Sequence, residues 1–110
     1  EWSPFGHSRR MLDFCRAHHI VLQAYSPLTR GERLGDERLL QIAQGCGRTP
    51  AQVLVRWNLQ HGTVPLPKAN QLAHLRENID VFGFTIPAAE MARLDELNEH
   101  WSALGGLPYA

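Results

Sequence analysis

An α/β fold with parallel strands is predicted from three features of the sequence. Two short apolar segments that contain β-branched residues, 20–25 and 63–66, alternate with segments that have the 3.6-residue periodicity of helices. Strands that alternate with helices at this spacing form parallel βα units with right-handed crossovers. We expect about two parallel strands and five helices. Because two strands alone would leave both sheet edges unpaired, these elements are expected to belong to a larger α/β sheet.

The composition is that of one ordinary globular domain. The 110 residues include 11 basic and 11 acidic side chains, so the formal net charge is zero, and 44% of the residues are hydrophobic. Nucleic acid and anionic membranes attract clustered positive charge, and we therefore expect neither as a partner. No apolar segment is long enough to span a membrane, and residues 1–10 lack the apolar core of a signal peptide, which predicts a cytoplasmic location.

The first helix is predicted over 8–18, where apolar residues recur at three- and four-residue steps: Met11, Leu12, Phe14 and Cys15. The nearly continuous apolar run 20–25 predicts a strand that is covered on both faces. Pro27 ends this strand because proline cannot donate a hydrogen bond to the sheet, and the polar segment 29–35 predicts a loop.

Two helices follow the loop. Asp36 is the expected N-cap of the first, which ends at Gly45 and Gly47. The segment 49–52 has threonine at the N-cap, proline at the first helical position and glutamine placed for a capping box, which predicts a helix over 50–60. That helix is expected to bury Val53, Leu54 and Trp57. Two cysteines, Cys15 and Cys46, fit no metal-ligand spacing and are expected to be buried, reduced thiols.

The second strand, 63–66, is followed by two further helices. Asn70 is a candidate N-cap for a helix with an apolar stripe, Leu72, Leu75 and Ile79, beneath which Val81, Phe82 and Phe84 are expected to pack. Pro87 opens the last helix, whose buried side is marked by Met91, Leu94 and Leu97. The tail 103–109 is expected to be irregular.

The sequence contains a single lysine. Of the 11 basic residues, ten are arginine and one, Lys68, is lysine. Lys68 lies in the segment 64–70, immediately after the second predicted strand. A lone exposed lysine is more often a solvated charge than a ligand contact, and both interpretations stay open from composition alone.

Several segments of the chain resemble the C-terminal part of the aldo-keto reductases. The most specific are Ala24–Leu28, the helix start 49–53 with Arg56 and Trp57 after it, and Pro67–Asn70 continuing to Arg76–Asn78. The opening segment, 1–5, resembles the residues after that family's sixth barrel strand. The resemblance implies that residues 1–110 form one partial domain, a C-terminal fragment of a (β/α)8 TIM barrel.

The resemblance also implies part of a dinucleotide site, because family members bind NADP(H) or NAD(H) and transfer hydride to or from a carbonyl. Tyr25 would stack against the nicotinamide, and Ser26 and Leu28 would continue along the pyrophosphate. An aromatic face suits a planar nicotinamide ring. Judged by residue type alone, a tyrosine such as Tyr25 is more often part of the core than a cofactor contact. A serine followed by a proline, as at Ser26, is typical of a simple turn.

The adenosine end is implied by residues after the second strand. Lys68 would contact the 2'-phosphate, and a helix that begins near Asn70 would turn its free N–H groups toward the same anion. Glu77 and Asn78 would contact the adenine. The implied contact of Lys68 with the 2'-phosphate makes NADP the expected cofactor. Where the family often has arginine, this chain has His74, a weaker and pH-dependent cation, so NAD stays possible.

No residue of the chain matches the family's catalytic tyrosine, lysine, aspartate or histidine, which come from the N-terminal half of the barrel. Tyr109 has no predicted partner, and His18 and His19 are expected to be structural or surface residues. The chain is therefore expected to hold part of the cofactor site without being catalytically complete alone, with no metal site. The alternative is a non-catalytic half-barrel that serves as a binding or assembly module, and exposed strand edges predict self-association.

Overall fold

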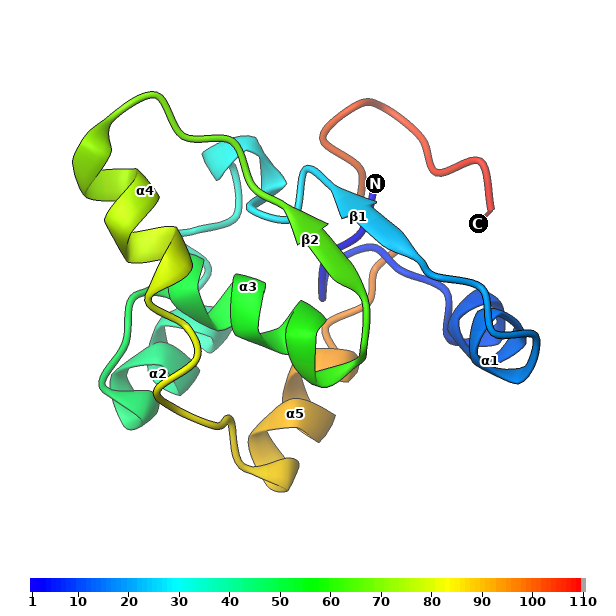
Figure 1. The fold of residues 1–110 in the computed structure, drawn as a ribbon, viewed down its shortest axis with the longest axis horizontal. Helices are drawn as coiled ribbons and strands as arrows, with labels where there is room; N and C mark the ends of the chain where they lie inside the picture. The colour runs from blue at the N-terminus through cyan, green and yellow to red at the C-terminus, as the bar shows by residue number, and fades with distance from the viewer. Residues whose placement is uncertain (110) are drawn as a thin grey trace.

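The computed structural model describes residues 1–109, which form five α-helices, one 3-10 turn and one two-stranded parallel sheet (Figure 1). In chain order the elements are α1 Arg9–Ala17, β1 Gln23–Tyr25, the 3-10 turn Thr29–Gly31, α2 Glu37–Cys46, α3 Pro50–Gln60, β2 Val64–Leu66, α4 Leu72–Ile79 and α5 Ala88–Asp95. The predicted α/β class, with two parallel strands and five helices, is confirmed.

The two strands pair directly with each other. Ala24 lies opposite Pro65, Tyr25 lies opposite Leu66, and the N–H of Val64 donates to the carbonyl oxygen of the residue before β1 at 2.9 Å. Because the strands are parallel, the segments that follow them leave the sheet at the same end, where both strands have their carboxyl termini. This end of the sheet therefore brings together two loops that are about 40 residues apart in the sequence.

The core is built around α3, which contacts α2, α4 and β2 (Figure 1). The three residues that the sequence predicts to be buried on this helix, Val53, Leu54 and Trp57, are at most 1% exposed. The core cluster is completed by residues of the N-terminal segment, α2 and α5, among them Phe5, Leu39, Ile42 and Leu94. Burial of these apolar side chains is the main favourable contribution to folding.

Local capping residues set the helix ends where the sequence predicts them. Asp36 accepts a hydrogen bond from the backbone N–H of Arg38, and Gly47 ends α2 in the left-handed conformation. Thr49 and Gln52 form a complete capping box at the start of α3, with proline at the first helical position. These bonds satisfy backbone groups that a helix terminus would otherwise leave unpaired.

The first predicted strand is too long. Of the run 20–25, only Gln23–Tyr25 pairs as a strand, and Ile20 and Val21 are 51% and 69% exposed rather than covered on both faces. A parallel strand is covered by helices of the neighbouring βα units. Each of these strands pairs with only one other strand among residues 1–109, so the cover that further βα units provide is incomplete there.

The predictions for α4 are also partly wrong. The N-cap position is Gln71 rather than Asn70, and no side chain caps the helix. The predicted apolar stripe is largely exposed, at 61% for Leu72, 52% for Leu75 and 70% for Ile79, because no described element covers that face of the helix. Of the apolar residues after α4, Val81 is buried and Phe82 is exposed.

The expectations for the two cysteines and for Tyr109 are corrected. Cys15 and Cys46 are free thiols, as expected, but both are only partly buried. Tyr109 is not without a partner, because its hydroxyl donates to the backbone carbonyl oxygen of Glu1 and its ring lies 5.6 Å from that of Trp2. The irregular tail therefore packs back on the first residues of the chain.

Candidate functional site

A polar cavity of about 590 Å³ lies at the carboxyl ends of the two strands. One wall comes from the segment after β1, and the other comes from residues 66–74, which run from the end of β2 into the first turn of α4. The lining residues are Ser26, Pro27, Leu28, Arg30, Gly31, Leu34, Leu66, Lys68, Ala69, Asn70, Gln71 and His74. Ligand sites in parallel α/β folds are built at this end of the strands.

Five of the eight predicted cofactor contacts line this cavity: Ser26, Leu28, Lys68, Asn70 and His74. Neither wall could form the cavity alone, because the first two residues follow β1 and the other three follow β2. The parallel pairing of Ala24 with Pro65 is what places the two walls side by side.

The charge of the cavity suits an anion. Three lining residues are basic, namely Arg30, Lys68 and His74, and none of the described residues that line it is acidic. All three are exposed to solvent. The adjacent N-terminus of α4 has no side-chain cap, so its first-turn N–H groups add to the positive potential at this wall.

The wall that follows β1 has an unusual backbone. Ser26, Thr29 and Arg30 have φ angles of 48°, 58° and 53°, and Gly31 has a φ of 80°. Left-handed backbone is rare for residues other than glycine and is a real outlier for a β-branched residue such as threonine. Such strain persists where the surrounding structure enforces it, and it clusters at functional sites.

Hydrogen bonds hold this left-handed turn in place. Thr29 is fully buried, and its hydroxyl donates to the carbonyl oxygen of Leu28 at 2.6 Å. The hydroxyl oxygen of Thr29 also accepts a hydrogen bond from the backbone N–H of Arg33 at 3.0 Å. The sequence predicts only a loop here, and the left-handed residues Thr29 and Arg30 are not its glycines, Gly31 and Gly35. Arg30 was therefore missed as a cavity residue, although its basic side chain was a possible signal.

Tyr25 ends β1 and does not line the polar cavity. It lies on the strand face opposite to buried Ala24, and it is 46% exposed. Its backbone carbonyl oxygen accepts a hydrogen bond from the N–H of Trp2 at 3.3 Å, which ties the strand end to the N-terminal segment. An exposed aromatic side chain at this position is free to contact a planar ring.

The two predicted adenine contacts also lie outside the polar cavity. Glu77 is held at the start of α3, where its carboxylate accepts from the hydroxyl of Thr49 at 2.5 Å and its backbone carbonyl accepts from Gln52 at 3.1 Å. Asn78 is buried and lines a different cavity. The structure therefore groups five of the predicted residues and leaves Tyr25, Glu77 and Asn78 apart from them.

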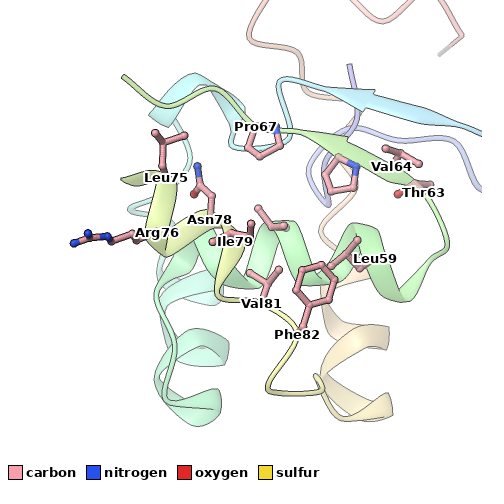
Figure 2. Close-up of a pocket in the computed structure, with 12 residues that line it drawn as sticks. Leu59, Thr63, Val64, Pro67, Leu75, Arg76, Asn78, Ile79, Val81 and Phe82 are labelled. Carbon is pink, nitrogen blue, oxygen red and sulfur yellow. The ribbon is translucent and has the colours of Figure 1, made fainter. Parts of the chain in front are cut away.

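The second cavity is an apolar groove of about 560 Å³ between α3, β2 and α4 (Figure 2). It is lined by Val55, Leu59, Thr63, Val64, Pro65, Pro67, Leu75, Arg76, Asn78, Ile79, Val81 and Phe82. Several of these apolar side chains are strongly exposed, up to 72% for Phe82. Such a surface suits packing against another apolar element rather than binding a phosphate.

Within residues 1–109, no group of three or more histidine, cysteine, aspartate or glutamate side chains is placed to hold a metal ion. None of the helices in that range has the length and apolar character needed to cross a bilayer.

Comparison with known proteins gives a consistent result. The model of the aldo/keto reductase family matches residues 1–99. An oxidoreductase of Schizosaccharomyces pombe is 42% identical over 103 residues, which are 94% of this chain and 36% of that protein. The 9,11-endoperoxide prostaglandin H2 reductase of Trypanosoma cruzi is 39% identical over 98% of this chain and 39% of its own length.

Solved structures agree with the sequence comparison. The apo crystal structure of Gox0644 superposes with a TM-score of 0.82 at 39% identity, over 86% of this chain and 35% of that one. A point mutant of the same protein, which superposes equally well, was solved in complex with NADPH. The chain thus spans between a third and two fifths of the length of these relatives.

Proposed function

The chain belongs to the aldo/keto reductase family, and from this premise we propose that it forms part of an NADP(H)-binding site of a carbonyl or alcohol oxidoreductase. It shares the (β/α)8 barrel fold of its structural neighbours over the portion that it covers. The proposal is supported by the NADPH complex of Gox0644 and by relatives that are themselves oxidoreductases.

One observation carries the proposal, namely the convergence of Lys68, His74 and Ser26 on one polar cavity at the carboxyl ends of the strands. The donors fit the group in question, because ammonium, imidazole N–H and hydroxyl groups all donate hydrogen bonds to phosphate oxygens. Lys68 is exposed and has no ion pair with any of residues 1–109. The preference for NADP over NAD rests on this side chain as the contact of the 2'-phosphate.

The remaining contacts are proposed around the cavity. When bound, the nicotinamide supplies or accepts the hydride, and half-exposed Tyr25 would support its ring from the end of β1. Leu28 and Asn70 also line the cavity and are proposed as further cofactor contacts. Glu77 and Asn78 remain proposed adenine contacts because α4, which carries both, begins at the cavity wall.

Proton transfer is proposed to depend on a further polypeptide segment. None of the described residues that line the polar cavity is a tyrosine or a carboxylic acid. A carbonyl reductase needs a proton donor within hydrogen-bond reach of the substrate oxygen, and the two other possible donors of the cavity, Lys68 and His74, are the proposed phosphate contacts. The chain is therefore proposed to bind and orient part of the cofactor, while a segment that packs on its exposed surfaces supplies the proton donor.

The test is to compare binding of NADPH and NADH to the wild-type chain and to Lys68→Met by calorimetry. We expect Lys68→Met to weaken NADPH binding by about tenfold, since one charge-assisted contact with phosphate is lost, and to leave NADH binding unchanged. Equal losses for both dinucleotides would remove Lys68 from the 2'-phosphate. Calorimetry is the suitable readout because no tryptophan lines the polar cavity within the described residues.

A non-catalytic assembly module is the second candidate function. It is favoured by the apolar groove and by the outer edges of β1 and β2, which pair with no further strand among residues 1–109. Absence of NADPH binding by a folded chain that nevertheless self-associates would favour this function over the cofactor-binding one.

A further inference from the structure

We propose that Arg33 is a positioning residue of the polar cavity, which fastens the wall after β1, residues 26–34, to the C-terminal part of the chain at Glu99 and Trp101. Arg33 does not itself line the cavity, whereas its neighbour Leu34 does. The identity of the ligand, a nicotinamide dinucleotide, rests on the proposed function. The anchor itself rests on the contacts of the Arg33 side chain.

The wall after β1 has a strained backbone that depends on tertiary contacts. Thr29 and Arg30 adopt left-handed φ angles of 58° and 53° although neither is glycine. A backbone of this kind persists only where the surrounding structure over-determines it. Arg33 is bonded to this turn directly, because its backbone N–H donates to the hydroxyl of Thr29 at 3.0 Å. Its side chain is therefore well placed to hold the turn from outside.

The guanidinium of Arg33 contacts both carboxylates and aromatic rings. It donates to the two carboxylate oxygens of Glu99 at 3.3 and 3.4 Å and to Asp36 at 3.1 Å. It also lies over the rings of Phe5 and Trp101, at 4.2 and 5.3 Å from their centroids. A guanidinium can make both kinds of contact at once, since its donors lie in its plane and its face stacks on aromatic rings.

The segment 98–102, which follows α5, is a firm anchor because it is bonded to the N-terminal segment. The backbone N–H groups of Glu99 and Trp101 both donate to the carbonyl oxygen of Phe5, at 2.9 and 3.0 Å. The backbone of Trp101 also packs so closely on Gly6 that a Cβ at that glycine would lie 2.0 Å from the carbonyl oxygen of the tryptophan. The wall is therefore fastened to a part of the molecule that is itself held by backbone bonds.

Arg38 distinguishes this anchor from the ion pairs that accompany it. Arg38 lies on α2 and pairs with the same two carboxylates, those of Asp36 and Glu99, at 2.8 Å each. Within residues 1–109 its guanidinium lies over no aromatic ring, and its side chain is 48% exposed, against 17% for Arg33. Loss of Arg38 therefore removes the same charge and comparable ion pairs but leaves the wall attached.

An anchored wall binds a ligand more tightly because less of the population lies outside the binding conformation. The apparent affinity falls in proportion to the fraction of molecules in that conformation. The effect is common to NADPH and NADH, since it concerns the wall and not the 2'-phosphate. Coupling between two sites is reciprocal, so binding at the cavity should also stabilise the segment 98–102, none of whose residues lines the cavity.

The experiment compares the wild type, Arg33→Met and the matched control Arg38→Met by calorimetry with NADPH and NADH, and by amide hydrogen exchange. We expect Arg33→Met to weaken both dinucleotides by the same factor, about tenfold, which corresponds to a binding-competent fraction of about one tenth. Arg38→Met should bind both like the wild type. NADPH should slow amide exchange at Glu99 and Trp101 in the wild type and in Arg38→Met, but not in Arg33→Met.

Three results would overturn the role of Arg33 while leaving cofactor binding intact. They are wild-type affinity in folded Arg33→Met, equal losses in Arg33→Met and Arg38→Met, and a loss confined to NADPH. If the wild type binds neither dinucleotide, the proposed function fails, and exchange without ligand decides on the anchor. Faster exchange at Gly31 in Arg33→Met alone would support the anchor, because the N–H of Gly31 bonds the carbonyl oxygen of Leu28 within the turn, and unchanged exchange would overturn it.

Two further variants separate positioning from a general loss of stability. Arg33→Lys keeps the charge and should recover part of the affinity, because an ammonium also binds over an aromatic ring. Thermal unfolding checks that each variant is folded. If Arg33→Met does not fold, Trp101→Leu removes the ring at the other end of the same link and should give the same loss for both dinucleotides. Wild-type affinity in folded Trp101→Leu would then contradict the anchor.

Discussion

His7 is a buried residue whose ring contacts those of Trp2 and Trp57, at centroid distances of 5.8 and 5.2 Å. Burial is the main cause that lowers the pKa of this imidazole, and it outweighs the opposing effect of the bond between Nδ1 and the carbonyl oxygen of Ser3. The folded protein therefore holds His7 neutral at a pH where the unfolded chain would already be partly protonated.

This burial predicts a pH-dependent stability. Because the folded pKa lies below the unfolded value of about 6.5, the unfolded chain binds more protons as the pH falls through that value, and the folded state loses stability. Urea unfolding at pH 7.5, 6.5 and 5.5 should show a falling free energy of unfolding in the wild type. The decrease should be smaller in His7→Phe, and an identical pH dependence in both proteins would contradict the buried neutral state.

Capping residues act at the scale of the helix, and Thr49 is the clearest case. Its hydroxyl accepts the N–H of Gln52 at 3.2 Å and donates to the carboxylate of Glu77 on α4. We expect Thr49→Ala to lower the free energy of unfolding by about 1 kcal/mol, since it removes the N-cap of the central helix. Chemical denaturation measures the loss.

The control for this prediction is Thr49→Ser, which keeps the hydroxyl and should keep most of the stability. Equal losses in the alanine and serine variants would show that the methyl group, not the cap, is what stabilises the start of α3.

The elements whose ends are set by neighbouring residues in the sequence were predicted well. The start of α3 follows from a threonine cap, a proline and a glutamine within four positions, and the observed helix has the predicted range. Strand length and the burial of α4 depend instead on elements distant in the sequence. Ile20 and Leu75 are apolar in a regular pattern, and a pattern cannot show whether anything covers it.

The residues of the candidate site also differ in whether local sequence or tertiary packing determines their position. The convergence of Ser26 and Lys68 could be predicted because parallel strands end at one edge of a sheet. The contribution of Arg30 could not, since the left-handed turn at Thr29 and Arg30 is enforced by tertiary burial rather than by glycine. Tyr25, Glu77 and Asn78 do not line this cavity, and their proposed roles rest on the family together with the position of β1 and α4 beside the cavity wall.

Exposed apolar surface is the main property of the molecule as a whole. The apolar groove leaves Ile79 and Phe82 at least 70% exposed, and Val64 and Leu66 are exposed on β2, whose far edge has no partner strand among residues 1–109. Surfaces of this kind on a small protein favour association.

We therefore predict that the chain self-associates at micromolar concentration. Light scattering should give a mass above that of the 12.4 kDa chain. A double variant, Ile79→Glu with Phe82→Glu, should lower the mass because it places charge in the groove, and Leu40→Glu on α2 is the control because it is exposed outside the groove. A monodisperse monomer in the wild type would contradict the prediction.

The central claim is that the polar cavity, and not the apolar groove, binds the dinucleotide. Its most direct test is a titration of the 15N-labelled chain with NADPH, followed through the backbone amide resonances. We predict shifts centred on Ser26, Arg30, Lys68 and His74, with little change at Val81 and Phe82 of the groove. Shifts centred on the groove, or none at millimolar NADPH, would contradict it.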